Sequence, residues 1–277
     1  EAGGVASGTE AYYSFNFGNI HFVCLDSHDV SRAADGPMLT WLRSDLAAND
    51  RDWLVAFFHH PPYSKGSHDS DIETRSIEMR SIVLPVLERW GVDLVLSGHS
   101  HSYERSKLLN GHYGLSSSLS PIMVLDAGSG RDGDTGAYQK PALGPVGNAG
   151  AVYAVAGASG QISGGALNHP VMYVSLNVPG SMVIDVNGGR LDATYLDSSG
   201  AVRDSFTINK YDTMNMAPVV TNPGAQVGTV GVATSLQIVA TDANNDPLSY
   251  SASGLPAGLS LNASSGLISG TPSLAST

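Results

Sequence analysis

The sequence holds only one cysteine, Cys24, and this excludes an intramolecular disulfide. A single thiol leaves the redox compartment undecided. Cys24 lies in an apolar run from residue 20 to residue 25, where a free thiol is expected to pack as a small hydrophobic side chain.

Positive charge is also scarce. Four of the 277 residues are lysine, and the formal net charge is −11. The chain therefore lacks the basic surface that binding to a nucleic-acid backbone requires. The same acidic surface repels anionic substrates, so phosphate chemistry would need a concentrated local positive charge such as a metal ion.

Long apolar runs are absent as well. No run approaches the roughly 20 residues of a membrane-spanning helix, so we expect no membrane span. The chain begins with neither methionine nor a signal peptide, and its first residues are typical of a loop. We expect it to be part of a longer protein.

What is present is an alternation of strands and helices, which favours a layered α/β fold. Gly18-Asn19 separates two strand-like runs and predicts a hairpin. Pro85 is expected to bend the second helix. One predicted helix begins at Pro37, and a second spans residues 73–90. The predicted strands are 12–17, 21–25, 53–58, 93–97, 122–126, 152–156, 172–176, 181–186, 190–196 and 202–208.

The composition divides the chain into three segments. We expect residues 1–210 to form the main domain and residues 211–218 to form a linker. Residues 219–277 have no helical pattern and are rich in Thr, Ser, Gly, Pro and Val, which predicts a small all-β sandwich module.

Histidines follow two of the buried-type strands. The run 92–97 leads into Gly98-His99-Ser100-His101, and the run 53–58 leads into His59-His60-Pro61. Alternate residues of an extended segment point the same way, so we expect His99 and His101 to converge on one point. Neutral imidazole nitrogens bind transition metals, and the sequence therefore predicts a metal site at these strand ends.

These residues resemble a known family. His59-His60-Pro61-Pro62-Tyr63, followed by the string Gly-His-Ser-His-Ser-Tyr-Glu-Arg over residues 98–105, is similar to the C-terminal half of a calcineurin-like metallophosphoesterase of the purple acid phosphatase-like branch. The resemblance covers roughly residues 10–210. It implies a four-layer α/β/β/α sandwich that lacks its N-terminal part. Residues 219–277 resemble a partial Ig-like module that follows it.

The resemblance also implies the chemistry. Two metal ions, iron with zinc, manganese or a second iron, would bind a hydroxide that attacks a phosphate ester. His59 and His99 would hold one ion and His101 the other. His68 would contact the phosphate or protonate the leaving alkoxide. An alternative for His68, that it is an ordinary solvated loop histidine, stays open. His60 competes with His59 for the inward position, and the His-x-Pro register selects His59.

The chain departs from the family in one respect. The family's first three motifs, which supply the carboxylates, normally precede a segment like that from Tyr12 to Asp26, and none lies ahead of Tyr12 here. This chain therefore carries the histidine half of a binuclear site, and we expect it to be inactive alone. The alternative is a non-catalytic extracellular binding or adhesion protein with a degenerate phosphoesterase domain.

The Ig-like module and the acidic surface indicate an extracellular or cell-surface location of the bacterial secreted type. We expect the substrate to be a phosphate ester, and the module to contact carbohydrate or a cell surface.

Overall fold

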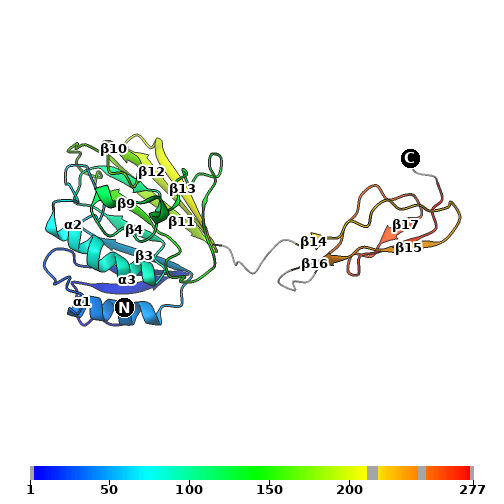
Figure 1. Cartoon of the computed structure of the whole chain (residues 1–277), viewed down its shortest axis with the longest axis horizontal. Coiled ribbons are helices and arrows are strands. Elements are labelled where there is room, and N and C mark those ends of the chain that lie inside the picture. The colour runs from blue at the N-terminus through cyan, green and yellow to red at the C-terminus, as the bar shows by residue number, and fades with distance from the viewer. Residues whose placement is uncertain (1–2, 211–217, 243–247, 275–277) are drawn as a thin grey trace. The chain divides into compact units, whose positions relative to one another are not determined.

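The computed structural model describes residues 3–210, 218–242 and 248–274. The chain divides into two compact units, residues 1–211 and residues 212–277 (Figure 1). Each unit is described by itself. No helix among the described residues is long and apolar enough to cross a membrane.

Seven strands form the main sheet of the first unit, in the order β1-β2-β3-β4-β9-β5-β10. The four strands β2, β3, β4 and β9 run parallel, so their carboxyl ends meet at one edge of the sheet. The other three join it through antiparallel pairs. The bounds are β1 Tyr13–Phe17, β2 Ile20–Cys24, β3 Trp53–Phe58, β4 Leu94–Ser97, β9 Val152–Ala156, β5 Tyr103–Ser106 and β10 Met172–Leu176.

Helices cover one face of this sheet. The helix α1 spans Pro37–Ala48 and begins with the proline that the sequence predicted at its first turn. The predicted helix 73–90 is built from α2 Thr74–Glu78, a π-helical segment η1 Met79–Val83, and α3 Leu84–Arg89. Pro85 has no N–H to donate, and the π-helical segment directly before α3 changes the backbone pairing at that point.

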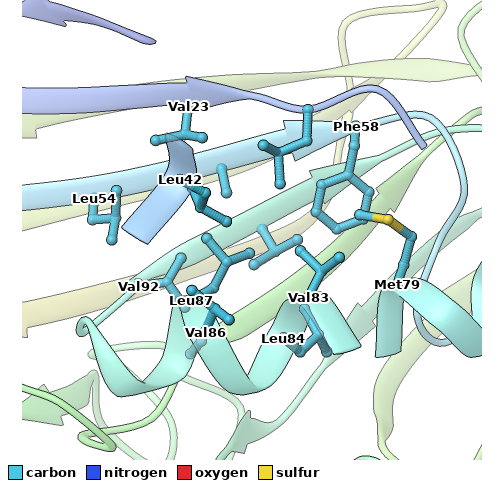
Figure 2. Packing of buried hydrophobic residues seen from close by; sticks show 14 of the residues in the cluster. Val23, Leu42, Leu54, Phe58, Met79, Val83, Leu84, Val86, Leu87 and Val92 are labelled. Carbon is cyan, nitrogen blue, oxygen red and sulfur yellow. The ribbon is translucent and has the colours of Figure 1, made fainter. Parts of the chain in front are cut away.

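The helices pack on the sheet through one hydrophobic cluster (Figure 2). Met79, Val83 and Leu87 extend from the helical segments toward the strand residues Leu54 and Phe58, and all five are buried. Each such side chain contributes about 1.5–3 kcal/mol of burial free energy. This packing fixes the strands whose ends carry the histidines.

The second sheet packs on the other face of the first. Trp53, Val55 and Leu94 of the main sheet share a buried cluster with Leu191 and Phe206 of the second. The result is an α/β/β arrangement, three of the four predicted layers, and the predicted α/β class is confirmed. The strand order is β11-β12-β13-β8, with β11 Gly180–Asn187, β12 Arg190–Asp197, β13 Val202–Lys210 and β8 Tyr138–Lys140.

One predicted strand is only half right. The run 122–126 begins as a 3₁₀ turn, η3 Pro121–Met123, and only Val124–Asp126 forms a strand, β7, which pairs with β6 Leu108–Leu109. Pro121 favours the first position of a helical turn, and Ile122 is exposed rather than buried. A second 3₁₀ turn, η2, spans Ser116–Ser118.

The second unit is all-β in its described residues, as predicted. Two strands, β14 Val219–Val220 and β16 Ala240–Thr241, form an antiparallel pair. A three-stranded antiparallel sheet has the order β15-β18-β17, with bounds Thr234–Gln237, Leu267–Gly270 and Leu259–Leu261.

Candidate metal centre

The centre forms where β3 and β4 end side by side. The two strands pair in parallel up to Phe58 and Ser97, and the Gly98 N–H then donates to the His59 carbonyl oxygen at 3.0 Å. This bond extends the ladder by one step beyond the strands. As a result His59 Nε2 lies 3.0 Å from His99 Nδ1, although the two residues are 40 positions apart in sequence.

The backbone turns sharply at His99. Its φ is 60°, in the left-handed region that non-glycine residues rarely adopt, and the Ser100 N–H donates to the Gly98 carbonyl oxygen at 2.7 Å. Such conformations cost about 1–3 kcal/mol and concentrate at functional sites. The extended geometry on which the predicted convergence of His99 and His101 rested therefore ends at Gly98.

His101 lies apart from the groups of candidate ligands. Its Nδ1 is 2.9 Å from Ser163 Oγ, and its N–H donates to Ser67 Oγ at 3.0 Å. Among the described residues, it joins neither of the two groups whose nitrogen or carboxylate atoms lie within 4.8 Å of one another.

The first of these groups is His59, His60 and His99. His60 is buried, and both its N–H and its Nδ1 lie 2.9 Å from Ser27 Oγ. The sequence selected His59 alone from this pair. The structure brings both to His99, because Ser27, in the loop that follows the neighbouring strand β2, holds the buried His60 ring.

The second group is His68, Glu73 and His99. The Glu73 carboxylate places Oε1 2.5 Å from His68 Nδ1 and Oε2 2.9 Å from His99 Nε2. His68 therefore lies beside His99, and its predicted role toward the phosphate stays a prediction. Sequence reasoning missed Glu73 altogether. Its only local signal is its place five residues after His68, at the start of the predicted helix.

A buried carboxylate holds the loop that carries His68. Glu104 accepts hydrogen bonds from Ser64 Oγ at 2.6 Å, from the Lys65 N–H at 3.1 Å and from Ser102 Oγ at 2.9 Å. Gly66 lets the loop lie close, because a Cβ there would come within 2.2 Å of Ser100 Oγ. Glu104 thus fixes the loop of His68 to the turn of His99.

Burial favours the neutral form of the imidazoles of the first group. It lowers the pKa of His59 and of His99, and the charges of neighbouring histidines act in the same direction, while Glu73 opposes the shift at His99. For His60, burial and then the charge of His99 lower the pKa to about 4. Neutral imidazole is the form that binds a metal.

The donor set fits one transition-metal ion. His59 Nε2 and His99 Nδ1 face each other, and three imidazoles supply nitrogen donors within a few ångströms. Such a set suits zinc, iron or manganese rather than calcium. A hollow of about 350 Å³ lies against the site and leaves room for a ligand. It is lined by His60, His68, Glu73, Thr74, Arg75 and His99.

Two strings in the chain have the residue pattern of the family's carboxylate motifs, but they follow Tyr12 instead of preceding it. Asp26, in Asp-Ser-His, accepts the N–H groups of His28 and Asp29 in a turn. Tyr138, in the string from Gly133 to Tyr138, is buried on β8 of the second sheet. Neither joins the two candidate groups among the described residues.

Comparison with known proteins finds a family match for each of the two parts of the chain. Residues 3–103 match the family model described as "Calcineurin-like phosphoesterase", and residues 217–277 match the one described as "Putative Ig domain". The resemblance predicted from the motifs is confirmed for both parts. The first match includes His59, His68, His99 and His101.

Curated relatives point the same way. Purple acid phosphatase 18 of Arabidopsis thaliana is 34% identical over 143 residues, which cover 49% of this chain and 30% of that protein. Purple acid phosphatase 23 of the same plant is 40% identical over 103 residues, which cover 36% of this chain and 21% of that protein. The chain thus spans less than a third of the length of these relatives.

Among solved structures, purple acid phosphatase PPD1 from yellow lupin seeds is similar in fold. Its TM-score is 0.56 at 18% identity, over 72% of this chain and 32% of that chain. This likeness supports the metallophosphoesterase fold.

Proposed function

We propose that this chain supplies the histidine side of a metal-dependent phosphoesterase site, which hydrolyses phosphate esters in the manner of an acid phosphatase. One observation carries the proposal: His59 Nε2 and His99 Nδ1 lie 3.0 Å apart at the ends of two parallel strands. The match of residues 3–103 to the calcineurin-like phosphoesterase family supports it.

His59, His60 and His99 would hold the first ion, and His101 would face the second. When bound, the two ions polarise a water molecule and neutralise charge on the phosphoryl oxygens. Iron paired with zinc, manganese or a second iron suits such imidazole-plus-carboxylate sites. Among the described residues, the two groups contain a single carboxylate, that of Glu73, and it contacts two histidines.

The chain's own residues bind and orient the ester. The hollow beside His99 admits the phosphoryl group, and Arg75 at its wall adds a positive charge that an anionic ester requires. His68 stands on the same wall, and its ring lies 3.7 Å from that of His99 between centroids. From there His68 would donate a proton to the leaving alkoxide oxygen.

The location and partners of the whole protein belong to the same proposal. We infer an extracellular or cell-surface protein whose Ig-like module contacts carbohydrate or another surface. Exposed Val227 and Val230 lie beside an apolar hollow of that module and offer a contact surface.

Turnover of p-nitrophenyl phosphate with added zinc, iron or manganese tests the enzymatic proposal. Since the carboxylate motifs are missing ahead of Tyr12, we expect this chain to hydrolyse the ester no faster than its His99→Ala variant. In the protein encoded by the complete gene, His99→Ala and His101→Ala should each abolish turnover. Exposed His28 provides the matched control, and His28→Ala should keep it.

Metal-dependent turnover by this chain alone would contradict the half-site account. Wild-type rates in the His99→Ala and His101→Ala variants of the complete protein would remove both residues from the mechanism.

A further inference from the structure

Glu73 contacts two imidazoles with the two oxygens of one carboxylate. The rings of His68 and His99 are 3.7 Å apart between centroids and inclined by 36°, so their in-plane nitrogen lone pairs lie in two separate planes. Each ring meets a different carboxylate oxygen: Oε1 lies 2.5 Å from His68 Nδ1, and Oε2 lies 2.9 Å from His99 Nε2.

The backbone around Glu73 keeps its carboxylate in place. The Glu73 N–H donates to the Asp69 carbonyl oxygen at 3.2 Å, and the Ile77 N–H donates to the Glu73 carbonyl oxygen at 3.0 Å. Lys65 pairs with Asp69 at 2.7 Å and with Asp71 at 2.9 Å, which closes the loop before the helix. Glu73 therefore lies at a loop-to-helix junction that backbone hydrogen bonds and ion pairs hold in place.

An ionised carboxylate can only accept hydrogen bonds. Glutamate is ionised at neutral pH, and each Glu73 oxygen lies within hydrogen-bond distance of one ring nitrogen. The nitrogens that face Glu73 must then carry the protons. These are His68 Nδ1, 2.5 Å from Oε1, and His99 Nε2, 2.9 Å from Oε2.

We propose that Glu73 is a positioning residue that sets the tautomers of His99 and His68 together. With its proton on Nε2, His99 has its lone pair on Nδ1, the atom that faces His59 at 3.0 Å. With its proton on Nδ1, His68 presents Nε2 as the ring nitrogen left for the ester. There Nε2 would first take up a proton and then pass it to the leaving alkoxide oxygen, while Nδ1–H stays on Glu73. One carboxylate thus aligns both the metal ligand and the group that transfers the proton.

This inference rests on the proposed function for the roles of the two histidines, but its test does not require turnover. Long-range ¹H–¹⁵N correlation spectra of the metal-free chain report which ring nitrogen of each histidine is protonated. We expect Nδ1–H for His68 and Nε2–H for His99. Glu73→Gln replaces one acceptor oxygen by an NH2 donor, so one of the two histidines should change to its other tautomer.

Zinc affinity, measured by competition with a chromophoric chelator, gives the second readout. Loss of a carboxylate that orients a ligand histidine typically weakens metal binding about 10–100-fold, and we expect this for Glu73→Gln. Glu78→Gln is the matched control, because Glu78 lies five residues further on and pairs with Arg32 at 2.7 Å instead. It should change neither the tautomers nor the affinity.

An Nε2–H tautomer of His68 in the wild-type chain would overturn the inference. So would a Glu73→Gln variant with wild-type tautomers and wild-type zinc affinity. If the wild-type chain binds no zinc but shows both expected tautomers, and Glu73→Gln changes one of them, the positioning role of Glu73 stands and the proposed metal site fails.

Discussion

The surroundings of each histidine decide what it can do. At the strand ends, imidazole nitrogens face one another and a hollow. His169 instead lies buried against Tyr63, with ring centroids 5.6 Å apart, and its Nε2 has no hydrogen-bond partner among the described residues. A proton on such a ring is costly because burial removes the water that would solvate its charge.

This burial predicts a loss of stability in acid. Burial lowers the pKa of His169 to about 3 in the folded chain, below the ~6.5 of an unfolded histidine. Between these values the unfolded chain binds the proton more tightly, so stability is greatest above about pH 6.5 and falls as the pH drops toward 3. From pH 7 to pH 5, the wild type should lose about 2 kcal/mol more than His169→Gln.

Urea denaturation at the two pH values measures this difference in the free energy of unfolding. His28→Gln changes an exposed histidine and should fall in parallel with the wild type. Equal losses for the wild type and His169→Gln would show that the proton on His169 carries no such cost.

At this scale the sequence predicts some site residues and not others. His59, His68 and His99 come from short motifs whose spacing and residue types are specific. Glu73 is 26 positions from His99, and only the closed loop after Lys65 brings its carboxylate to that ring. His60 depends on Ser27 of the loop that follows another strand, a contact that no local pattern indicates.

Among the structural elements, the turn of residues 98–102 depends on close packing against the end of β9. The Gly157 N–H donates to the Ser102 carbonyl oxygen at 3.2 Å, and a Cβ at Gly157 would come within 2.0 Å of the Ser100 carbonyl oxygen. Backbone atoms cannot move aside as a flexible side chain would. The turn that carries His99 therefore requires glycine at this position.

Gly157→Ala should destabilise the chain by about 1–3 kcal/mol, the usual range for overpacking, and should weaken zinc binding because the turn shifts. Gly160→Ala is the matched control three residues away, where a Cβ meets nothing within 4 Å. Thermal unfolding and zinc titration of both variants check this. Equal stability and zinc affinity in the two variants would contradict the packing argument.

The secondary structure follows from hydrophobic periodicity to a large extent. Strands such as Trp53–Phe58 and Val152–Ala156 agree with their apolar runs, because strands buried on both faces are continuously hydrophobic. The π-helical segment Met79–Val83 and the 3₁₀ turn at Pro121 were missed. Both are local changes of hydrogen-bond pattern that leave the spacing of apolar residues nearly unaltered.

At the scale of the whole first unit, a buried ionic network joins the two sheets. Asp204 of β13 accepts hydrogen bonds from Arg105 of β5 at 2.6 and 3.0 Å and from the Tyr103 hydroxyl at 2.8 Å. The side chains of Asp204 and Arg105 are fully buried. The strand β5 follows the His99 turn directly, so this network anchors the site to the second sheet.

Asp204→Asn should lower the free energy of unfolding by about 3–5 kcal/mol, because it leaves the buried Arg105 without its counter-charge. Asp192→Asn on the neighbouring strand β12 is the control. Its pair with Arg190 is exposed, so the loss should be under about 1 kcal/mol. Similar urea midpoints for the two variants would show that the network does not hold the sheets together.

The layered class, the small β module and the family were predictable from the sequence, because strand–helix alternation and the strings at residues 59–63 and 98–105 are strong signals. The pairing of Asp204 with Arg105, 99 positions apart, was not, because the two residues meet only when the sheets pack. Asp242, Asn244 and Asp246 have a calcium-like spacing in the sequence, with an ordinary polar turn as the alternative, and Asn244 and Asp246 lie outside the described residues.

The central claim is that the imidazoles at the ends of β3 and β4 bind a metal ion together. X-ray absorption spectroscopy of the chain loaded with one equivalent of zinc tests it most directly. We predict imidazole nitrogen scattering near 2.0–2.1 Å, about the usual Zn–N distance, in the wild type and in His28→Ala, and its loss in His59→Ala and His99→Ala. Zinc that binds equally well, with the same spectrum, in the His59→Ala and His99→Ala variants would contradict the account.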